Sequence, residues 1–351
     1  MMNDESGFRF VIHHMFFMKK CLFPLVVLFF FACKKAPNEL PAEPLLAVPE
    51  GFPMPVFPEG NELTPERWAL GKRLFFDPVL SSDSTVSCAS CHISEKAFTD
   101  GKQFSEGVEG RLGTRNAPTL ANVAYHPYYT REGGVPTLEM QILVPIQEHA
   151  EFDFNILLIA ERLNRDSSYV QQSSQAYDRE PDAFVITRSI ACFERTILSG
   201  RSPYDEFLNG KNSALTTAEK RGKDLFFGER LACSQCHGGF NFTHYAFENN
   251  GLYEDYPDPG RFRLTGKEED RALFKVPSLR NVGVTAPYMH DGSLPTLEAV
   301  VEHYNSGGKD HPHKSQLIKP LNLTTKEKTD LIAFLKALTD DDFLNNPKFR
   351  E

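Results

Sequence analysis

The sequence predicts a mainly α-helical protein that contains two similar domains. Three observations in the 351-residue chain support this: apolar residues recur at helical spacing, long alternating strand-like runs are lacking, and segments of the first half have counterparts in the second. Hydrophobic residues make up 41% and charged residues 24%, which is a globular composition rather than a disordered one. The formal net charge of −9 leaves no excess of cations to neutralise phosphates, so nucleic acid is a poor partner.

Residues 1–33 predict a lipoprotein-type signal peptide. Two lysines precede an apolar run over residues 22–32, which is shorter than the ~20 apolar residues that a membrane-spanning helix needs. Ala32 followed by Cys33 resembles a bacterial lipoprotein cleavage site, so we expect a periplasmic protein that is anchored through a lipid on Cys33. An ordinary export signal with an incidental cysteine is the alternative. The Pro-rich residues 34–58 predict an extended tether.

Four of the seven cysteines form two copies of one motif, C-x-x-C-H, at residues 88–92 and 233–237. Two thiols at this spacing can add to the two vinyl groups of a porphyrin, which makes the adjacent histidine the proximal ligand of the iron. A zinc site with four cysteine ligands would not require a histidine after each pair, and a thioredoxin-like redox pair expects a βαβ context. We therefore predict two covalently bound haem c groups, with these attachment and ligand residues: Cys88, Cys91, His92, Cys233, Cys236 and His237.

Similar segments flank the two haem motifs in the same order. They are GKRLFF and GKDLFF at residues 71–76 and 222–227, PTLANV and PSLRNV at 118–123 and 277–282, and EGGVPTLE and DGSLPTLE at 132–139 and 291–298. The repetition predicts an internal duplication of a one-haem, cytochrome c-like domain. We expect the N-terminal haem domain at residues 59–210 and the C-terminal haem domain at residues 211–345.

Local signals place helices within these repeats. Thr64 and Pro65 provide an N-cap and a proline at the first helical position. Thr137 and Thr296 are expected N-caps of the helices that follow each P-T-L-E segment. Residues 324–339 carry apolar side chains at helical spacing and predict the helix that closes the second domain. Cys192, in an apolar stretch, is expected to be a buried thiol without a partner.

These motifs resemble those of the bacterial di-haem cytochrome c peroxidase family, from about residue 63 to residue 338. The resemblance is carried by LGKRLFFDP, SCASCH, GTRNAPTLANV, PTLEMQILVPIQEHAEF, CSQCH, VPSLRNV and APYMHDGSLPTLEAVVEHY. In that family the N-terminal haem is peroxidatic and the C-terminal haem accepts electrons from a donor protein. The resemblance implies that Glu151 moves a proton between the peroxide oxygens and that Gln141 orients the peroxide. The alternative for Glu151 is a solvated acid in a polar loop.

Three positions depart from the pattern of the best-known peroxidases. A histidine before RNAPT blocks their peroxidatic iron until the other haem is reduced, whereas residues 97–119 here contain no histidine and Val108 is aligned with it. We therefore expect a first haem that is open without reductive activation. Arg131 stands where the family usually has a tryptophan between the haems. Tyr304 aligns with the distal methionine of the second haem, as in the MauG-like branch, and Met289 is the rival ligand.

The resemblance also implies a calcium site formed by Asn116 and the backbone carbonyls of Thr285 and Pro287. We predict a di-haem c-type peroxidase that reduces hydrogen peroxide to water with electrons from a small redox protein, either a cytochrome c or a cupredoxin. One alternative is a MauG-like di-haem oxidase that modifies a protein substrate. The other is a non-catalytic di-haem electron carrier. Contact with a membrane is expected only through the N-terminal lipid, and a homodimer is compatible with the resemblance.

Overall fold

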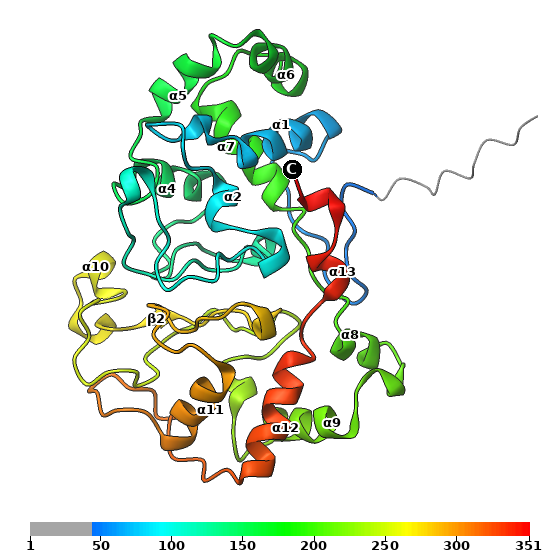
Figure 1. Cartoon of the computed structure of the whole chain (residues 1–351), viewed down its shortest axis with the longest axis vertical. Coiled ribbons are helices and arrows are strands. Elements are labelled where there is room, and N and C mark those ends of the chain that lie inside the picture. The colour runs from blue at the N-terminus through cyan, green and yellow to red at the C-terminus, as the bar shows by residue number, and fades with distance from the viewer. Residues whose placement is uncertain (1–43) are drawn as a thin grey trace, which may run out of the picture. The chain divides into compact units, whose positions relative to one another are not determined.

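Helices are the main regular secondary structure of residues 44–351, the part of the chain that the computed structural model describes (Figure 1). The prediction of a mainly α-helical fold is therefore confirmed. The predicted signal peptide, the lipidation site Cys33 and the first part of the Pro-rich segment lie outside the described residues. Within residues 44–351, no helix combines the length and the apolar character needed to cross a bilayer.

Thirteen α-helices and two short strands are connected by turns of 3₁₀ helix and irregular segments in this part of the chain. The helices are α1 (Pro65–Phe76), α2 (Cys88–Cys91), α3 (Leu138–Gln141), α4 (Leu143–Gln147), α5 (Ile156–Leu163), α6 (Ser167–Tyr177), α7 (Ala183–Glu194), α8 (Pro203–Leu208), α9 (Thr217–Phe227), α10 (Phe262–Thr265), α11 (Leu297–Ser306), α12 (Thr325–Lys336) and α13 (Asp341–Leu344). The strands β1 (Phe247–Glu248) and β2 (Phe274–Lys275) pair antiparallel.

The first hydrophobic core is built around the helices α1 and α7. As predicted, Thr64 caps α1 and Pro65 occupies its first turn, while the apolar face of the helix is buried. Gly71 allows the two helices to touch, because a Cβ atom there would lie 1.9 Å from the Ser189 carbonyl oxygen of α7. The Phe75 and Phe193 rings pack 5.1 Å apart across this contact.

The second hydrophobic core has the same arrangement in the helices α9 and α12. A Cβ atom at Gly222 would lie 1.9 Å from the Asp330 carbonyl oxygen. The Phe226 and Phe334 rings pack 5.4 Å apart. The helix α12 begins after its N-cap Thr324, so the predicted closing helix is confirmed. None of the buried residues of this core belongs to the first core.

Local structures recur between the two halves beyond these helix pairs. Thr137 and Thr296 cap α3 and α11, as predicted. Asn122 and Asn281, which occupy equivalent places in the repeated segments, both adopt the left-handed conformation, with φ of 63° and 61°. The haem motifs therefore sit in two similar local frameworks.

Two segments pack across both halves. Phe52, in the Pro-rich segment, lies 4.8 Å from the Phe240 ring and 6.1 Å from the Tyr125 ring. The part of the predicted tether from residue 44 is thus packed on the folded protein. Phe343 and Leu344, which fall within the predicted second domain (residues 211–345), pack in the first core, because the chain turns back after α12 and buries their apolar side chains there. The predicted domain boundaries stay predictions.

Candidate functional site

Both haem motifs line a single large cavity with a volume of about 970 Å³. The cavity wall includes every residue that the sequence predicts for haem attachment and proximal ligation: Cys88, Cys91, His92, Cys233, Cys236 and His237. Its lining is rich in aliphatic side chains such as Leu120 and Leu279, which suits a flat apolar macrocycle. The two haem motifs, which are 145 positions apart in the sequence, therefore line the same cavity.

The two motif histidines are held in the same way. The Nδ1 atom of His92 lies 2.8 Å from the Phe98 carbonyl oxygen, and that of His237 lies 3.2 Å from the Phe242 carbonyl oxygen. A proton on Nδ1 donated to a carbonyl leaves the Nε2 lone pair available to a metal. Burial also lowers the pKa of the His237 ring to about 4 and lowers the pKa of the His92 ring, so both rings are neutral.

The donor set of the cavity fits two haem c groups. None of the four motif cysteines takes part in a disulfide within the described residues, so their sulfur atoms are available to attach to vinyl groups, and each pair is followed by a neutral histidine. Residues 44–351 contain no cluster of three or more histidine, cysteine or acidic side chains that could hold a metal ion directly. The motif residues therefore suit the attachment of a porphyrin better than a zinc site made by the protein alone.

Gln141 and Glu151 line the same cavity as His92, although they come from different segments. Gln141 ends α3, and its Oε1 atom is buried without a hydrogen-bond partner among the described residues. Glu151 follows α4, and its side chain is accessible because it faces the open space of the cavity. The surrounding protein nevertheless removes most bulk water, which raises the pKa of Glu151 to about 7, and the nearby Glu148 carboxylate adds to the rise.

The loop that carries Glu151 is fixed by the segment that contains Val108. The Val108 backbone N–H donates to the Glu151 carbonyl oxygen at 2.9 Å. Gly107 permits this contact, because a Cβ atom there would lie 2.2 Å from the Ala150 carbonyl oxygen. The Val108 side chain is 0% exposed and belongs to the first core. The position aligned with the blocking histidine of the peroxidases is thus occupied by a buried apolar residue.

Tyr304 and Met289, the two candidate ligands of the second iron, both line the cavity. Asn250 lies between them, since its Nδ2 atom donates to the Met289 Sδ atom at 3.2 Å and its side chain also hydrogen-bonds Tyr304. Met289 has a φ of 78°, which is strained for a residue with a side chain. The structure therefore places both candidate ligands on the wall of the cavity that the second haem motif lines, and both assignments stay predictions.

The three residues predicted to bind calcium also line the cavity. They are Asn116, Thr285 and Pro287. The Asn116 Nδ2 atom donates to the Lys102 carbonyl oxygen at 2.9 Å, which fixes the orientation of the amide group. This arrangement brings the three residues to one space, and the calcium site stays a prediction.

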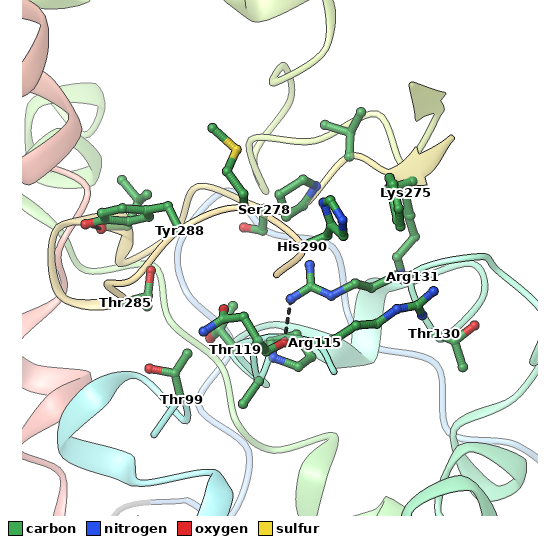
Figure 2. A pocket seen from close by; sticks show the side chains of 18 of the residues that line it. Thr99, Arg115, Thr119, Thr130, Arg131, Lys275, Ser278, Thr285, Tyr288 and His290 are labelled. Carbon is green, nitrogen blue, oxygen red and sulfur yellow. Dashed lines mark hydrogen bonds between the residues drawn. The ribbon is translucent and has the colours of Figure 1, made fainter. Parts of the chain in front are cut away.

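A set of basic residues lies where the two halves face each other. Figure 2 shows Arg115 and Arg131 of the first half beside Lys275 and His290 of the second half. Burial lowers the pKa of Arg131 to about 10 and that of Lys275 to about 8, and repulsion from a neighbouring arginine adds to each effect. The sequence pointed only to Arg131, because nothing in the local pattern indicates which cations become neighbours.

Glu194 is a second cavity residue that the sequence analysis missed. It ends α7, is 5% exposed and lines the cavity. Burial raises the pKa of its carboxyl to about 8. An acid within the apolar stretch AFVITRSIACFERTIL is the signal that could have identified it.

Comparisons with known proteins agree with this geometry. A family model described as di-haem cytochrome c peroxidase matches residues 65–213. The chain is 37% identical to the methylamine utilization protein MauG of Methylorubrum extorquens, over 83% of this chain and 82% of that protein. It is 35% identical to the cytochrome-c peroxidase IdrP1 of Pseudomonas sp. (strain SCT), over 84% of this chain and 86% of that protein.

A solved structure is also similar to the chain over most of its length. It is described as a MauG-like protein associated with microbial copper homeostasis, and it is 38% identical, with a TM-score of 0.80. The match covers 86% of this chain and 97% of that one. Proteins named as peroxidases and proteins named for MauG therefore both occur among the relatives.

Proposed function

The chain belongs to the di-haem cytochrome c peroxidase family, and from this premise we propose that it reduces hydrogen peroxide to water with two electrons from a small redox protein. The observation that carries the proposal is that Gln141 and Glu151 both line the cavity that His92 also lines. Gln141 offers an unpartnered amide oxygen, and Glu151 is a carboxyl with a pKa near neutrality. These are the groups that a small, protic substrate needs.

The family implies two haem c groups, and a haem ligated by His92 would supply the iron that activates the peroxide. The ionised Glu151 accepts a proton from one peroxide oxygen and returns it to the other, which leaves as water. The Gln141 amide oxygen accepts a hydrogen bond from the peroxide and orients it. Two protons and two electrons then complete the reduction of one peroxide to two waters.

We further propose that the first haem reacts without prior reduction of the second. The support is the buried Val108, which the packing of the first core holds away from the cavity wall. A histidine in the aligned segment would provide the sixth iron ligand, and valine has no ligand atom. The fully oxidised protein is therefore expected to show a high-spin signal in electron paramagnetic resonance that disappears when peroxide is added.

Several finer assignments complete the proposal. His237 would hold the second haem, together with Tyr304 or, as the alternative, Met289, and this haem would supply the site that accepts electrons from the donor protein. Calcium binds Asn116 and the carbonyls of Thr285 and Pro287. The repeated local structures support an origin of the two halves by duplication. Export to the periplasm and the lipid on Cys33 remain proposals from the sequence.

The experiment that tests the proposal is the substitution Glu151→Gln in the protein that carries both haems. We expect kcat/KM for peroxide to fall by about 10²–10⁴, because the proton-transfer group is lost while the shape of the cavity is kept. The haem absorption spectrum should stay unchanged. Glu161→Gln, an exposed acid of α5, serves as the matched control and should keep full activity. Undiminished turnover by Glu151→Gln would contradict the role of Glu151.

A MauG-like oxidase that modifies a protein substrate is the second candidate function. It is favoured by Tyr304 on the cavity wall and by the 38% identity to the MauG-like solved structure. Assays with different electron donors separate the two functions. Peroxide-dependent oxidation of reduced cytochrome c over many turnovers supports the peroxidase, whereas slow turnover with covalent modification of a partner protein supports the oxidase.

A further inference from the structure

Two cations on the wall of the cavity lack a carboxylate partner. Arg131 donates from Nη2 to the Asn116 carbonyl oxygen at 2.6 Å, and Lys275 donates from Nζ to the Tyr128 carbonyl oxygen at 2.9 Å. Neither side chain forms an ion pair with a described acidic residue. The two residues are also joined directly, because the Lys275 backbone N–H donates to the Arg131 carbonyl oxygen at 2.7 Å. Repulsion from Arg131 contributes to the lowered pKa of Lys275, so the two positive charges are close enough to interact at the cavity wall (Figure 2).

The acidic side chains around Arg131 and Lys275 bind other groups. Arg115 binds both oxygens of Asp258, at 2.6 Å and 2.9 Å, and also binds Glu132 at 2.6 Å. Asp291 accepts a hydrogen bond from the Tyr253 hydroxyl at 2.5 Å. The positive charge of Arg115 is thus balanced by two carboxylates, whereas the guanidinium of its neighbour Arg131 binds only a carbonyl oxygen. The protein supplies no direct counter-charge for Arg131 or Lys275.

Partly buried cations without a counter-charge are unfavourable, so the occupant of the cavity is expected to provide one. Arginine is suited to carboxylates, because its planar guanidinium can donate two parallel hydrogen bonds to the two oxygens. A haem carries two propionate groups at one edge, and both haem motifs line this cavity. The chemistry that fits the two cations is therefore already implied by the cofactors.

We propose that Arg131 and Lys275 form a carboxylate-binding site that holds haem propionates where the two halves meet. The inference rests on the two-haem part of the proposed function and does not depend on the identity of the substrate. Tryptophan usually occupies the position of Arg131 in the family that the sequence resembles. The chain thus places a positive charge, rather than an oxidisable ring, at this position of the cavity wall.

The test measures the midpoint potentials of both haems by spectroelectrochemistry in the loaded protein. A positive charge near a propionate favours the reduced state of the iron, because reduction adds an electron. Arg131→Gln and Lys275→Gln should each lower the midpoint potential of at least one haem. Arg131→Lys, which keeps the positive charge, should have potentials close to those of the wild-type protein. Two haems per chain and an unchanged absorption spectrum establish that the variants are folded and loaded.

A matched control removes one positive charge elsewhere. Arg188 of α7 lies 3.7 Å from the centre of the Phe184 ring and does not line the cavity, so Arg188→Gln should leave both potentials unchanged. Unshifted potentials in both Arg131→Gln and Lys275→Gln would overturn the proposal. If the wild-type protein did not turn over peroxide but the variants still showed the expected shifts in potential, the proposed function would be wrong and the carboxylate-binding site would stand.

The carboxylate could also come from solution, and added acetate distinguishes the two sources. If haem propionates fill the site, the wild-type potentials should not depend on acetate concentration at constant ionic strength. An acetate-dependent potential that disappears in Arg131→Gln would show that an external carboxylate occupies the site, and it would overturn the assignment to propionates.

Discussion

At the scale of single residues, Glu151 shows how the setting of a side chain decides its chemistry. In the sequence it is one of several acids in the segment QEHAEFD. In the structure it lies on the cavity wall, where limited access of water raises its pKa to about 7, while Asp153 in the same loop pairs with Arg111 at 2.8 Å and has a lowered pKa. Two acids two positions apart thus differ in their capacity to exchange a proton at neutral pH.

The pKa of Glu151 predicts the pH dependence of catalysis. The base is the ionised form, so kcat/KM for peroxide should rise with pH through about pH 7 and level off above it. Glu148 is the nearby acid that raises this pKa in addition to burial. Glu148→Gln removes its negative charge, which makes ionisation of Glu151 easier and should shift the rise in kcat/KM toward lower pH.

Steady-state kinetics across the pH range checks this prediction. The plateau at high pH should be similar in both proteins, because Glu151 is fully ionised there in each. A rise that stays in place or moves to higher pH in Glu148→Gln would show that another group controls the profile.

At the scale of secondary-structure elements, two helix pairs support the two haem motifs, and the helices of each pair are in close contact at one glycine. In each pair the backbone of the earlier helix touches the later one at a glycine, Gly71 or Gly222. The glycine costs about 0.5–1 kcal/mol of helix stability relative to alanine at an ordinary exposed position. The close approach of the helices offsets this cost by allowing the phenylalanine rings on either side to pack.

The substitution Gly222→Ala should therefore destabilise the protein despite the higher helix propensity of alanine. The added methyl group would overlap the Asp330 carbonyl oxygen and push α9 away from α12, with an expected loss of about 1–3 kcal/mol in the free energy of unfolding. Urea unfolding of the loaded protein measures the change. Asp224→Ala, at an exposed position of α9, is the control and should have little effect. A stabilised Gly222→Ala protein would mean that the helices are not in contact at this position.

Elements set by local chemistry were predictable from the sequence, whereas contacts between distant segments were not. The caps Thr64, Thr137 and Thr296 were predicted because an N-cap depends on a few neighbouring residues. The pairing of Arg131 with Lys275 was not predicted, because it joins residues 144 positions apart through the tertiary fold. The placement of Gln141 and Glu151 together was expected only from the family resemblance, since the residues between them give no signal of a shared cavity.

At the scale of the described molecule, residues 44–351 contain two hydrophobic cores that serve one cavity. Most of each core comes from one half of the chain, but the C-terminal segment leaves the second half and packs into the first. The Phe343 and Phe349 rings lie 5.7 Å and 5.9 Å from the Phe98 ring. Phe98 also provides the carbonyl oxygen that holds the Nδ1 atom of His92. The C-terminal segment thus supports His92, the predicted proximal ligand of the first haem.

This connection predicts an effect that is confined to one haem. Phe349→Ala leaves a cavity beside Phe98 and should lower the free energy of unfolding by about 3–5 kcal/mol. With weaker support for Phe98, the His92 ring can rotate, so the electron paramagnetic resonance signal of the first haem should broaden. The signal of the second haem should not change, because the His237 ring is held by the carbonyl of Phe242 in the other core. Asp342→Ala, at an exposed position of α13, controls for changes near the C-terminus. Equal broadening of both signals in Phe349→Ala would mean that the two haem environments respond as one unit, and the separate support of each proximal histidine would then be wrong.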